Sequence, residues 1–213
     1  MKLAVLFFGM SKSEYDNYWY KTRYLIDYEN SYENYKKYIF EFFKSKGYDI
    51  DVYFTTNQIN DEDRNEIIKK YIPVKCNFIQ NHPHHIIGRN SKIINVVDLC
   101  LESEITYDLV LITRFDLLFQ KDFNQSNIQF DKFNMVSILE KPNLICDNFY
   151  LFPYKYLKPF SEIAKNNFTS RFHDMKDELY AKINENSVNY ILNENCCISD
   201  LSFYKIVRTI MLS

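Results

Sequence analysis

Residues 107–119 have the sequence YDLVLITRFDLLF. Leu109 to Ile112 form a continuous apolar run, which is the pattern of a strand buried on both faces of a sheet. Arg114 and Asp116 follow this run, and on extended backbone residues two apart point to the same side. In open α/β sheets, ligands bind at the carboxyl ends of the strands. The run therefore predicts a guanidinium and a carboxylate at a ligand-binding edge. The alternative is a surface ion pair that only caps the strand.

Working outward, strand-like and helix-like patterns alternate through the first half of the chain. Strands are predicted over 2–8, 49–55, 74–79 and 109–112, and helices over 31–46, 61–71 and about 90–104. Ser31 is expected to cap the first helix, and residues 10–30 to form a short helix or a loop. This alternation predicts an α/β fold, a single domain built on a mostly parallel sheet flanked by helices, with strand 2–8 at its centre.

The second half has a less regular pattern. Strands are predicted over 133–139 and 148–152, helices over 153–166 and 173–184, and either state over 188–192 and 203–208. No internal repeat or linker divides the chain, which predicts one domain over residues 1–213.

Composition excludes several classes of protein. The formal net charge of −2 argues against nucleic-acid binding. Five cysteines with no C-x-x-C spacing indicate reduced thiols in an intracellular protein. Residues 1–10 are apolar, but they lack a basic segment beyond Lys2 and a cleavage site, so we expect a first strand rather than a signal peptide. No apolar run approaches the length of a transmembrane helix.

The run over 107–119 resembles the motif region of small GT-A-type glycosyltransferases, including enzymes of bacterial surface polysaccharides and giant viruses. These enzymes carry a D-x-D motif after a buried strand, and its last Asp binds the metal and the sugar-nucleotide diphosphate. Here Arg114 occupies the first acidic position and Asp116 the last, an R-x-D variant. The opening strand AVLFFG (4–9), the helix before the motif and the segment DNFYLFPYKYL (147–157) share the resemblance, which covers roughly residues 1–160 in outline.

The resemblance implies transfer of a hexose from a nucleoside-diphosphate sugar, with a UDP-sugar favoured, to a hydroxyl of a glycan or glycoprotein. It implies Mn²⁺ or Mg²⁺ bound by Asp116, with His173 as a supplementary ligand. It also implies a nucleotide-sugar-binding half over about 1–123 and an acceptor-binding half over about 124–213. We expect a cytoplasmic protein, which means host cytoplasm or virion if the protein is viral.

Further site residues follow from the matched positions. Phe8 and Gly9 end the first strand, where such enzymes contact the base and ribose, although Gly9 could simply make a turn. Arg89 and Lys92 open the helix before the motif and would clamp phosphate together with Arg114. A solvated basic turn is the alternative, and it is the favoured one for Lys92.

Asp147 precedes the predicted strand over 148–152. In an inverting enzyme of this architecture, an acceptor-side carboxylate acts as general base, and Asp147 is the first candidate for this role. Asp116 is the other residue predicted to be catalytic. Asp174, Glu178 and Glu194 are the other candidates. An Asp that only makes a turn or cap is the structural alternative.

Three other classes of protein fit part of the pattern. A sugar nucleotidyltransferase would share the sheet and a metal-binding carboxylate, but the sequence GMSK over 9–12 is poor in glycine for its phosphate loop. A non-catalytic glycan- or protein-binding module would fit the missing acidic residue. A structural interaction protein would bind neither nucleotide nor glycan.

Overall fold

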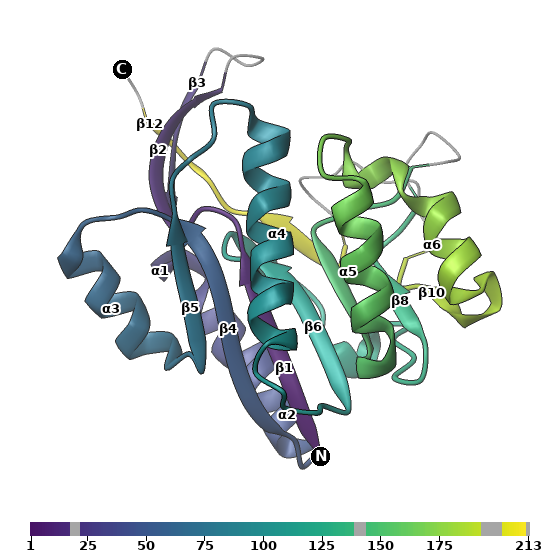
Figure 1. The fold of residues 1–213 in the computed structure, drawn as a ribbon. Coiled ribbons are helices and arrows are strands. Elements are labelled where there is room, and N and C mark those ends of the chain that lie inside the picture. Colours follow the sequence, from purple (N-terminus) through teal and green to yellow (C-terminus); the bar gives the residue numbers. More distant parts are fainter. Residues whose placement is uncertain (18–21, 139–143, 193–201, 212–213) are drawn as a thin grey trace.

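The computed structural model describes residues 1–17, 22–138, 144–192 and 202–211 (Figure 1). Seven strands form the central sheet in the order β10-β8-β9-β6-β1-β4-β5. The strands are β1 (Lys2–Phe8), β4 (Asp49–Asn57), β5 (Lys75–Ile79), β6 (Leu109–Arg114), β8 (Phe133–Met135), β9 (Phe149–Pro153) and β10 (Val188–Tyr190). β1 pairs in parallel with β4 and β6, whereas β9 is antiparallel to β6 and β8. The predicted mostly parallel sheet with a central first strand is confirmed.

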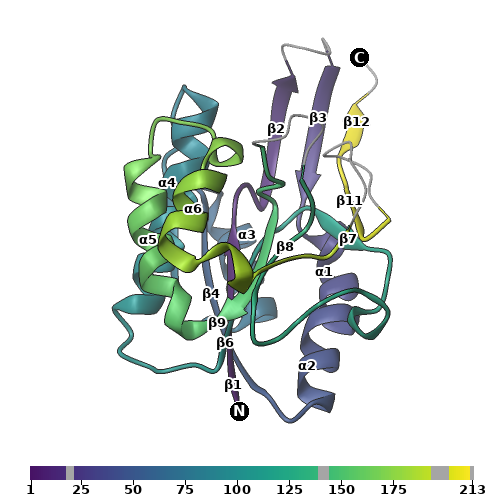
Figure 2. The ribbon, with the colours of Figure 1, turned by 90° about the vertical axis from the view of Figure 1, so that its right-hand side faces the viewer.

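Helices cover both faces of this sheet (Figures 1 and 2). One face packs against α4 (His85–Leu101), α5 (Leu157–Asn166) and α6 (Lys176–Ile183). The other face packs against α1 (Glu29–Tyr35), a π-helix (Lys36–Glu41), α2 (Phe42–Ser45) and α3 (Asp61–Tyr71). Single 3₁₀ turns cover Phe123–Gln125, Tyr154–Tyr156, Phe172–Asp174 and Glu185–Ser187. Within the described residues, no helix has the length and apolar character needed to cross a membrane.

The α3 helix has the bounds that its sequence predicts. Asn60 caps it, because its side chain accepts a hydrogen bond from Asp63 N at 2.9 Å. Acidic residues fill its first turn and lysines its last, which suits the helix dipole. Ile72 adopts a left-handed conformation at the end, just before Pro73.

Two smaller sheets complete the fold. β2 (Lys12–Asn17), β3 (Thr22–Asp27) and β12 (Thr209–Met211) form an antiparallel sheet that extends beyond the carboxyl ends of the central strands (Figure 2). β7 (Leu117–Phe119) pairs with β11 (Tyr204–Ile206). The prediction of a helix or loop over 10–30 is therefore wrong for the described residues 12–17 and 22–27. These two strands pair with each other, and β3 also pairs with β12, so backbone pairing rather than a side-chain period sets their structure.

Several predicted boundaries also shift. α1 begins at Glu29, and Ser31 lies inside it rather than capping it. α4 begins at His85, before the predicted start near residue 90, and Gly88 lies within its first turns. α5 and α6 begin later than predicted, each after a 3₁₀ turn, and the two undecided segments contain β10 and β11. Residue 139, the end of one predicted strand, lies outside the described residues.

Aromatic rings fill the core beneath the carboxyl ends of the strands. Phe115 is fully buried, and its ring stacks on Phe7 with centroids 5.2 Å apart. Phe54 and Tyr71 contact the same ring edge-on, at 5.8 and 5.6 Å. Phe115 thus anchors the chain between Arg114 and Asp116 in the core.

We expect Phe115→Ala to lower the free energy of unfolding by about 4 kcal/mol, because a large buried ring leaves a cavity when it is removed. Phe168→Ala is the matched control, since that ring is 38% exposed, and its cost should stay below about 1 kcal/mol. Urea denaturation followed by circular dichroism measures both. Equal costs for the two variants would contradict this account of the core.

Candidate functional site

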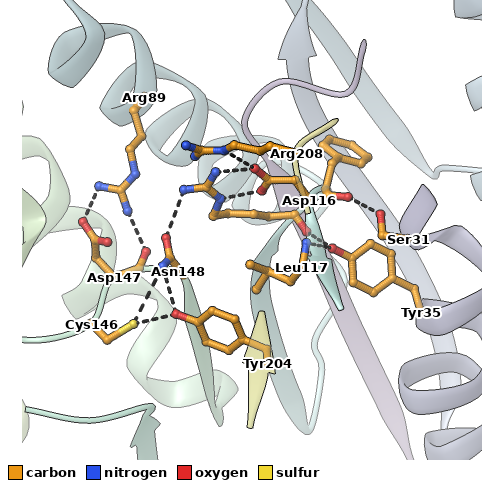
Figure 3. Close-up of polar contacts among 12 residues, drawn as sticks. Ser31, Tyr35, Arg89, Asp116, Leu117, Cys146, Asp147, Asn148, Tyr204 and Arg208 are labelled. Carbon is orange, nitrogen blue, oxygen red and sulfur yellow. Dashed lines mark hydrogen bonds and ion pairs between the residues drawn. The ribbon is translucent and has the colours of Figure 1, made fainter. Parts of the chain in front are cut away.

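The chain bends directly after β6, and two side chains from α1 hold the bend (Figure 3). The Tyr35 hydroxyl donates to Arg114 O at 2.7 Å and accepts from Leu117 N at 2.7 Å. The Ser31 hydroxyl donates to Phe115 O. These contacts satisfy backbone groups that lose strand pairing where β6 ends, so the bend is fixed from the helix layer.

Arg114 and Asp116 face each other across this bend. Arg114 Nε donates to Asp116 Oδ1 at 2.6 Å, and Arg114 Nη2 donates to Oδ2 at 2.5 Å. This two-point geometry is the strongest arrangement of a guanidinium and a carboxylate. The predicted projection of both side chains to one side of the strand end is confirmed.

A second arginine contacts the same carboxylate. Arg208 Nε lies 3.5 Å from Asp116 Oδ2, the oxygen that Arg114 Nη2 also contacts. Arg114 Nη1 donates to Asn148 Oδ1 at 3.1 Å, and Asn148 Nδ2 donates to the Tyr204 hydroxyl at 2.9 Å. No local sequence pattern points to Arg208 as a site residue. The scarcity of arginine in a lysine-rich chain was the one available signal.

The second acidic residue of the site is Asp147, just before β9. Its Oδ2 forms an ion pair with Arg89 Nη1, and Arg89 Nη2 donates to the Asp147 carbonyl at 2.6 Å. His173 Nδ1 lies 3.5 Å from Asp147 Oδ1 and 2.6 Å from Ile145 O. The Arg89 guanidinium also lies over the ring of Phe8, 5.6 Å from its centroid. Arg89 thus links the end of β1 to Asp147.

Five charged residues form ion pairs beside the ends of β1 and β6, and we call them the rim row: Arg89, Asp147, Arg114, Asp116 and Arg208. Figure 3 labels all of them except Arg114. Its arginine side chains are 16–28% exposed, whereas both aspartates are 3% exposed. The row has one more positive than negative charge. A ligand approaching from solvent therefore meets guanidinium groups, with the carboxylates beneath them, and an anion fits this surface best.

The charges of the rim row keep the Asp116 carboxyl ionised. Burial opposes ionisation of Asp116, but the charges of Arg114 and Arg208 outweigh it and lower the pKa of this carboxyl. Burial raises the pKa of the Tyr35 hydroxyl, so this residue stays a neutral hydrogen-bonding group. Asp116 is thus an anion clamped between cations.

Two of the predicted nucleotide contacts lie at the end of β1. Phe8 is buried beneath Arg89. Gly9 has a φ of +107°, a conformation that side-chain-bearing residues rarely adopt, and the space where a Cβ would lie is open. A ligand could approach the backbone here, next to the rim row.

Lys92 lies apart from these contacts. Because α4 begins at His85, Arg89 and Lys92 lie beyond its first turn rather than at its N-terminus. Lys92 is buried, and its Nζ donates to Asn81 Oδ1 at 3.1 Å and to Gly88 O at 3.3 Å. Burial lowers the pKa of this ammonium group. Its described contacts tie the preceding loop to the helix.

The predicted Mn²⁺ or Mg²⁺ site can be compared with the donors present. These ions bind oxygen ligands, and Mg²⁺ is usually held by one or two carboxylates together with waters and substrate phosphates. Both oxygens of Asp116 contact guanidinium groups, and His173 lies beside Asp147. Among the described residues, no group of three His, Cys, Asp or Glu side chains is placed to hold a metal. Because both Asp116 oxygens already contact cations, the described side chains do not fit such an ion as they stand.

The remaining base candidates lie elsewhere. Asp174 is exposed. Glu178 accepts hydrogen bonds from Asn166 Nδ2 at 2.8 Å and Asn167 Nδ2 at 2.6 Å, which fixes it between α5 and α6. Glu194 lies outside the described residues. Of the four candidates, Asp147 is the one that the described contacts place in the rim row.

We expect Tyr35→Phe to lower the free energy of unfolding by about 2 kcal/mol, because it leaves Arg114 O and Leu117 N buried without their partner. Tyr28→Phe is the matched control, since among the described residues the buried Tyr28 hydroxyl has no hydrogen-bond partner. Its removal should cost nothing. Urea denaturation measures both variants, and a similar loss in each would show that the bend does not depend on Tyr35.

The lowered pKa of Asp116 predicts an acid-sensitive fold. The contribution of this ionised group is present above the usual Asp pKa of about 4 and is lost as pH falls through the lower folded value. Asp116→Asn should lower stability by about 3 kcal/mol at neutral pH, because it leaves guanidinium groups unpaired, and should make the decline below about pH 4 shallower. Asp131→Asn, at an exposed acid, should leave the profile unchanged. Urea denaturation across this pH range checks these expectations, and identical profiles for wild type and Asp116→Asn would contradict them.

Comparison with known proteins gives similarity in structure alone. No family model and no curated protein matches this chain. The glycosyltransferase GlyE of Streptococcus pneumoniae TIGR4 is 12% identical with a TM-score of 0.45, and the match covers 88% of this chain and 44% of that one. A glycosyltransferase involved in the glycosylation of the major capsid of PBCV-1 is 8% identical with a TM-score of 0.49, covering 88% and 81%. The chain spans less than half the length of the GlyE chain, and similarity at this level assigns no activity to it.

Proposed function

We propose that this protein is a glycosyltransferase that moves a hexose from a nucleoside-diphosphate sugar, with a UDP-sugar favoured, to a hydroxyl of a glycan or glycoprotein. The observation that carries the proposal is the rim row, in which arginines face solvent above buried aspartates at the carboxyl ends of the central strands. This edge is where ligands bind in open α/β sheets. The R-x-D resemblance of residues 114–116 agrees with it.

The row suits a leaving group that gains negative charge. When the bond between the anomeric carbon and the diphosphate breaks, the electron pair goes to the diphosphate oxygen. Guanidinium groups already held in position stabilise this charge without reorganising. Arg114 is fixed by Asp116 and Asn148, and Arg89 by Asp147. In this assignment the nucleoside lies against the open backbone of Gly9 at the end of β1, and the diphosphate extends along the row.

Asp147 is the proposed general base if the reaction inverts the anomeric centre. The acceptor hydroxyl oxygen attacks the anomeric carbon, and its proton moves to the carboxylate. Oδ2 of Asp147 is engaged by Arg89, and Oδ1 has only the longer 3.5 Å contact with His173 Nδ1, so Oδ1 is the oxygen assigned to the acceptor. His173 lies on this side, and its contact with Ile145 O fixes the orientation of the ring.

One observation favours a second candidate function. Asp147 is almost fully buried and ion-paired, which is also the arrangement of a purely structural acid. A non-catalytic module on the same fold would bind a nucleotide sugar or an anionic glycan at the rim row without transferring the sugar. A measurement of sugar transfer distinguishes the two candidates, because only the enzyme releases nucleoside diphosphate from the donor.

The test is release of nucleoside diphosphate from a panel of nucleotide sugars mixed with simple glycan acceptors. We expect release with at least one donor, and an Asp147→Asn rate lower by about 100-fold, because general-base catalysis contributes about that much. Nucleotide affinity of this variant should stay within about threefold of wild type. Asp174→Asn, at an exposed acid, is the matched control and should keep the wild-type rate.

Each other result has a distinct meaning. Nucleotide binding without release from any donor would favour the binding module. An Asp147→Asn variant with the wild-type rate would remove Asp147 from the mechanism. A chain that binds no nucleoside diphosphate would contradict the proposed function itself.

A further inference from the structure

The fold brings Arg208 to Asp116 from a distant part of the chain. The two residues are 92 positions apart, and Arg208 lies between β11 and β12. β11 pairs with β7 and β12 pairs with β3, so strand pairing anchors the backbone on both sides of Arg208. Its neighbour Val207 donates from its backbone N to Asp116 O at 2.8 Å. The position of Arg208 is therefore built into the backbone.

We propose that Arg114 and Arg208 together bind the diphosphate of the donor and supply the positive charge otherwise expected from a divalent cation. Asp116 is then the counter-ion that holds the two arginines, and nucleoside-diphosphate binding requires no metal ion. This inference rests on the proposed function, because it concerns the same site and the same ligand.

Exposure is the first support. The Asp116 side chain is 3% exposed, whereas those of Arg114 and Arg208 are 16% and 28% exposed. The groups that solvent reaches are the cations. A diphosphate arriving from solvent meets them before it meets the carboxylate.

The hydrogen-bond geometry is the second support. A guanidinium carries five N–H donors, and the described contacts of Arg114 use three of them, one on each nitrogen. The second N–H groups of Nη1 and Nη2 are left to donate to phosphate oxygens. The planar fork of arginine suits such paired contacts with phosphate.

Charge is the third support. Oδ1 of Asp116 is engaged by Arg114, and Oδ2 by both Arg114 and Arg208. A divalent cation would have to displace guanidinium groups from these oxygens and would be repelled by them. A diphosphate can bind with the row intact, because its charge has the opposite sign. The arrangement therefore favours the anion over the cation.

The experiment is calorimetric titration of the whole chain with UDP, GDP, ADP, CDP and dTDP, in excess EDTA and again with MnCl₂. We expect at least one nucleotide to bind in EDTA, with an affinity within about threefold of that in Mn²⁺. Arg208→Gln should weaken this binding by about tenfold in both buffers, and Arg208→Lys should weaken it less, because it keeps the charge but not the fork.

Arg64→Gln is the matched control, because it removes the same charge from an exposed position on α3 and should leave affinity unchanged. Circular dichroism confirms that each variant is folded. Binding that EDTA abolishes and Mn²⁺ restores would overturn this inference and leave the proposed function standing. Unchanged affinity in Arg208→Gln would overturn it as well. No binding of any nucleotide in either buffer would overturn both proposals.

Discussion

The site depends on one ion pair, between Arg114 and Asp116, formed where a buried strand ends. A carboxylate as buried as Asp116 is stable as an anion only when cations and hydrogen bonds surround it. The fold meets this demand with elements that are distant in sequence. Tyr35 from α1 fixes the backbone of the bend, and Arg208, which follows β11, contacts the Asp116 carboxylate. The same bend that ends β6 therefore sets the position of both charged groups.

The arginines and aspartates of the rim row differ in solvent exposure, and this difference determines which ligands the edge attracts. If the aspartates of the rim row faced solvent, the edge would attract cations. Instead they lie beneath their arginines, so the surface that a ligand meets is positive although the chain as a whole is slightly acidic. The positive potential of this surface attracts a phosphate-bearing ligand, and the ion pairs with the buried aspartates hold the arginine side chains in position. In the proposed assignment, Arg114 at the first position of the sequence RFD favours an anionic partner at this edge.

Local patterns predicted the parts of the fold that local forces determine. The apolar run of β6 and the capped, charge-graded α3 have such signals, and both predictions are confirmed. The pairing of β2 with β3 was missed because these segments show no clean side-chain period, and β12, the third strand of this sheet, is distant in sequence. Arg208 was missed for the same reason, since its place beside Asp116 follows from long-range strand pairing. Ser31 is a residue type that often caps helices, but here its hydroxyl donates a hydrogen bond to the buried carbonyl of Phe115.

A crystal structure of the chain with a bound nucleoside diphosphate would test the central claim most directly. Our account predicts diphosphate oxygens within about 3 Å of side-chain nitrogens of both Arg114 and Arg208, with Asp116 still contacting these arginines and the nucleoside beside the backbone of Gly9. A diphosphate bound away from these arginines, or joined to Asp116 through a metal ion that displaces them, would contradict it.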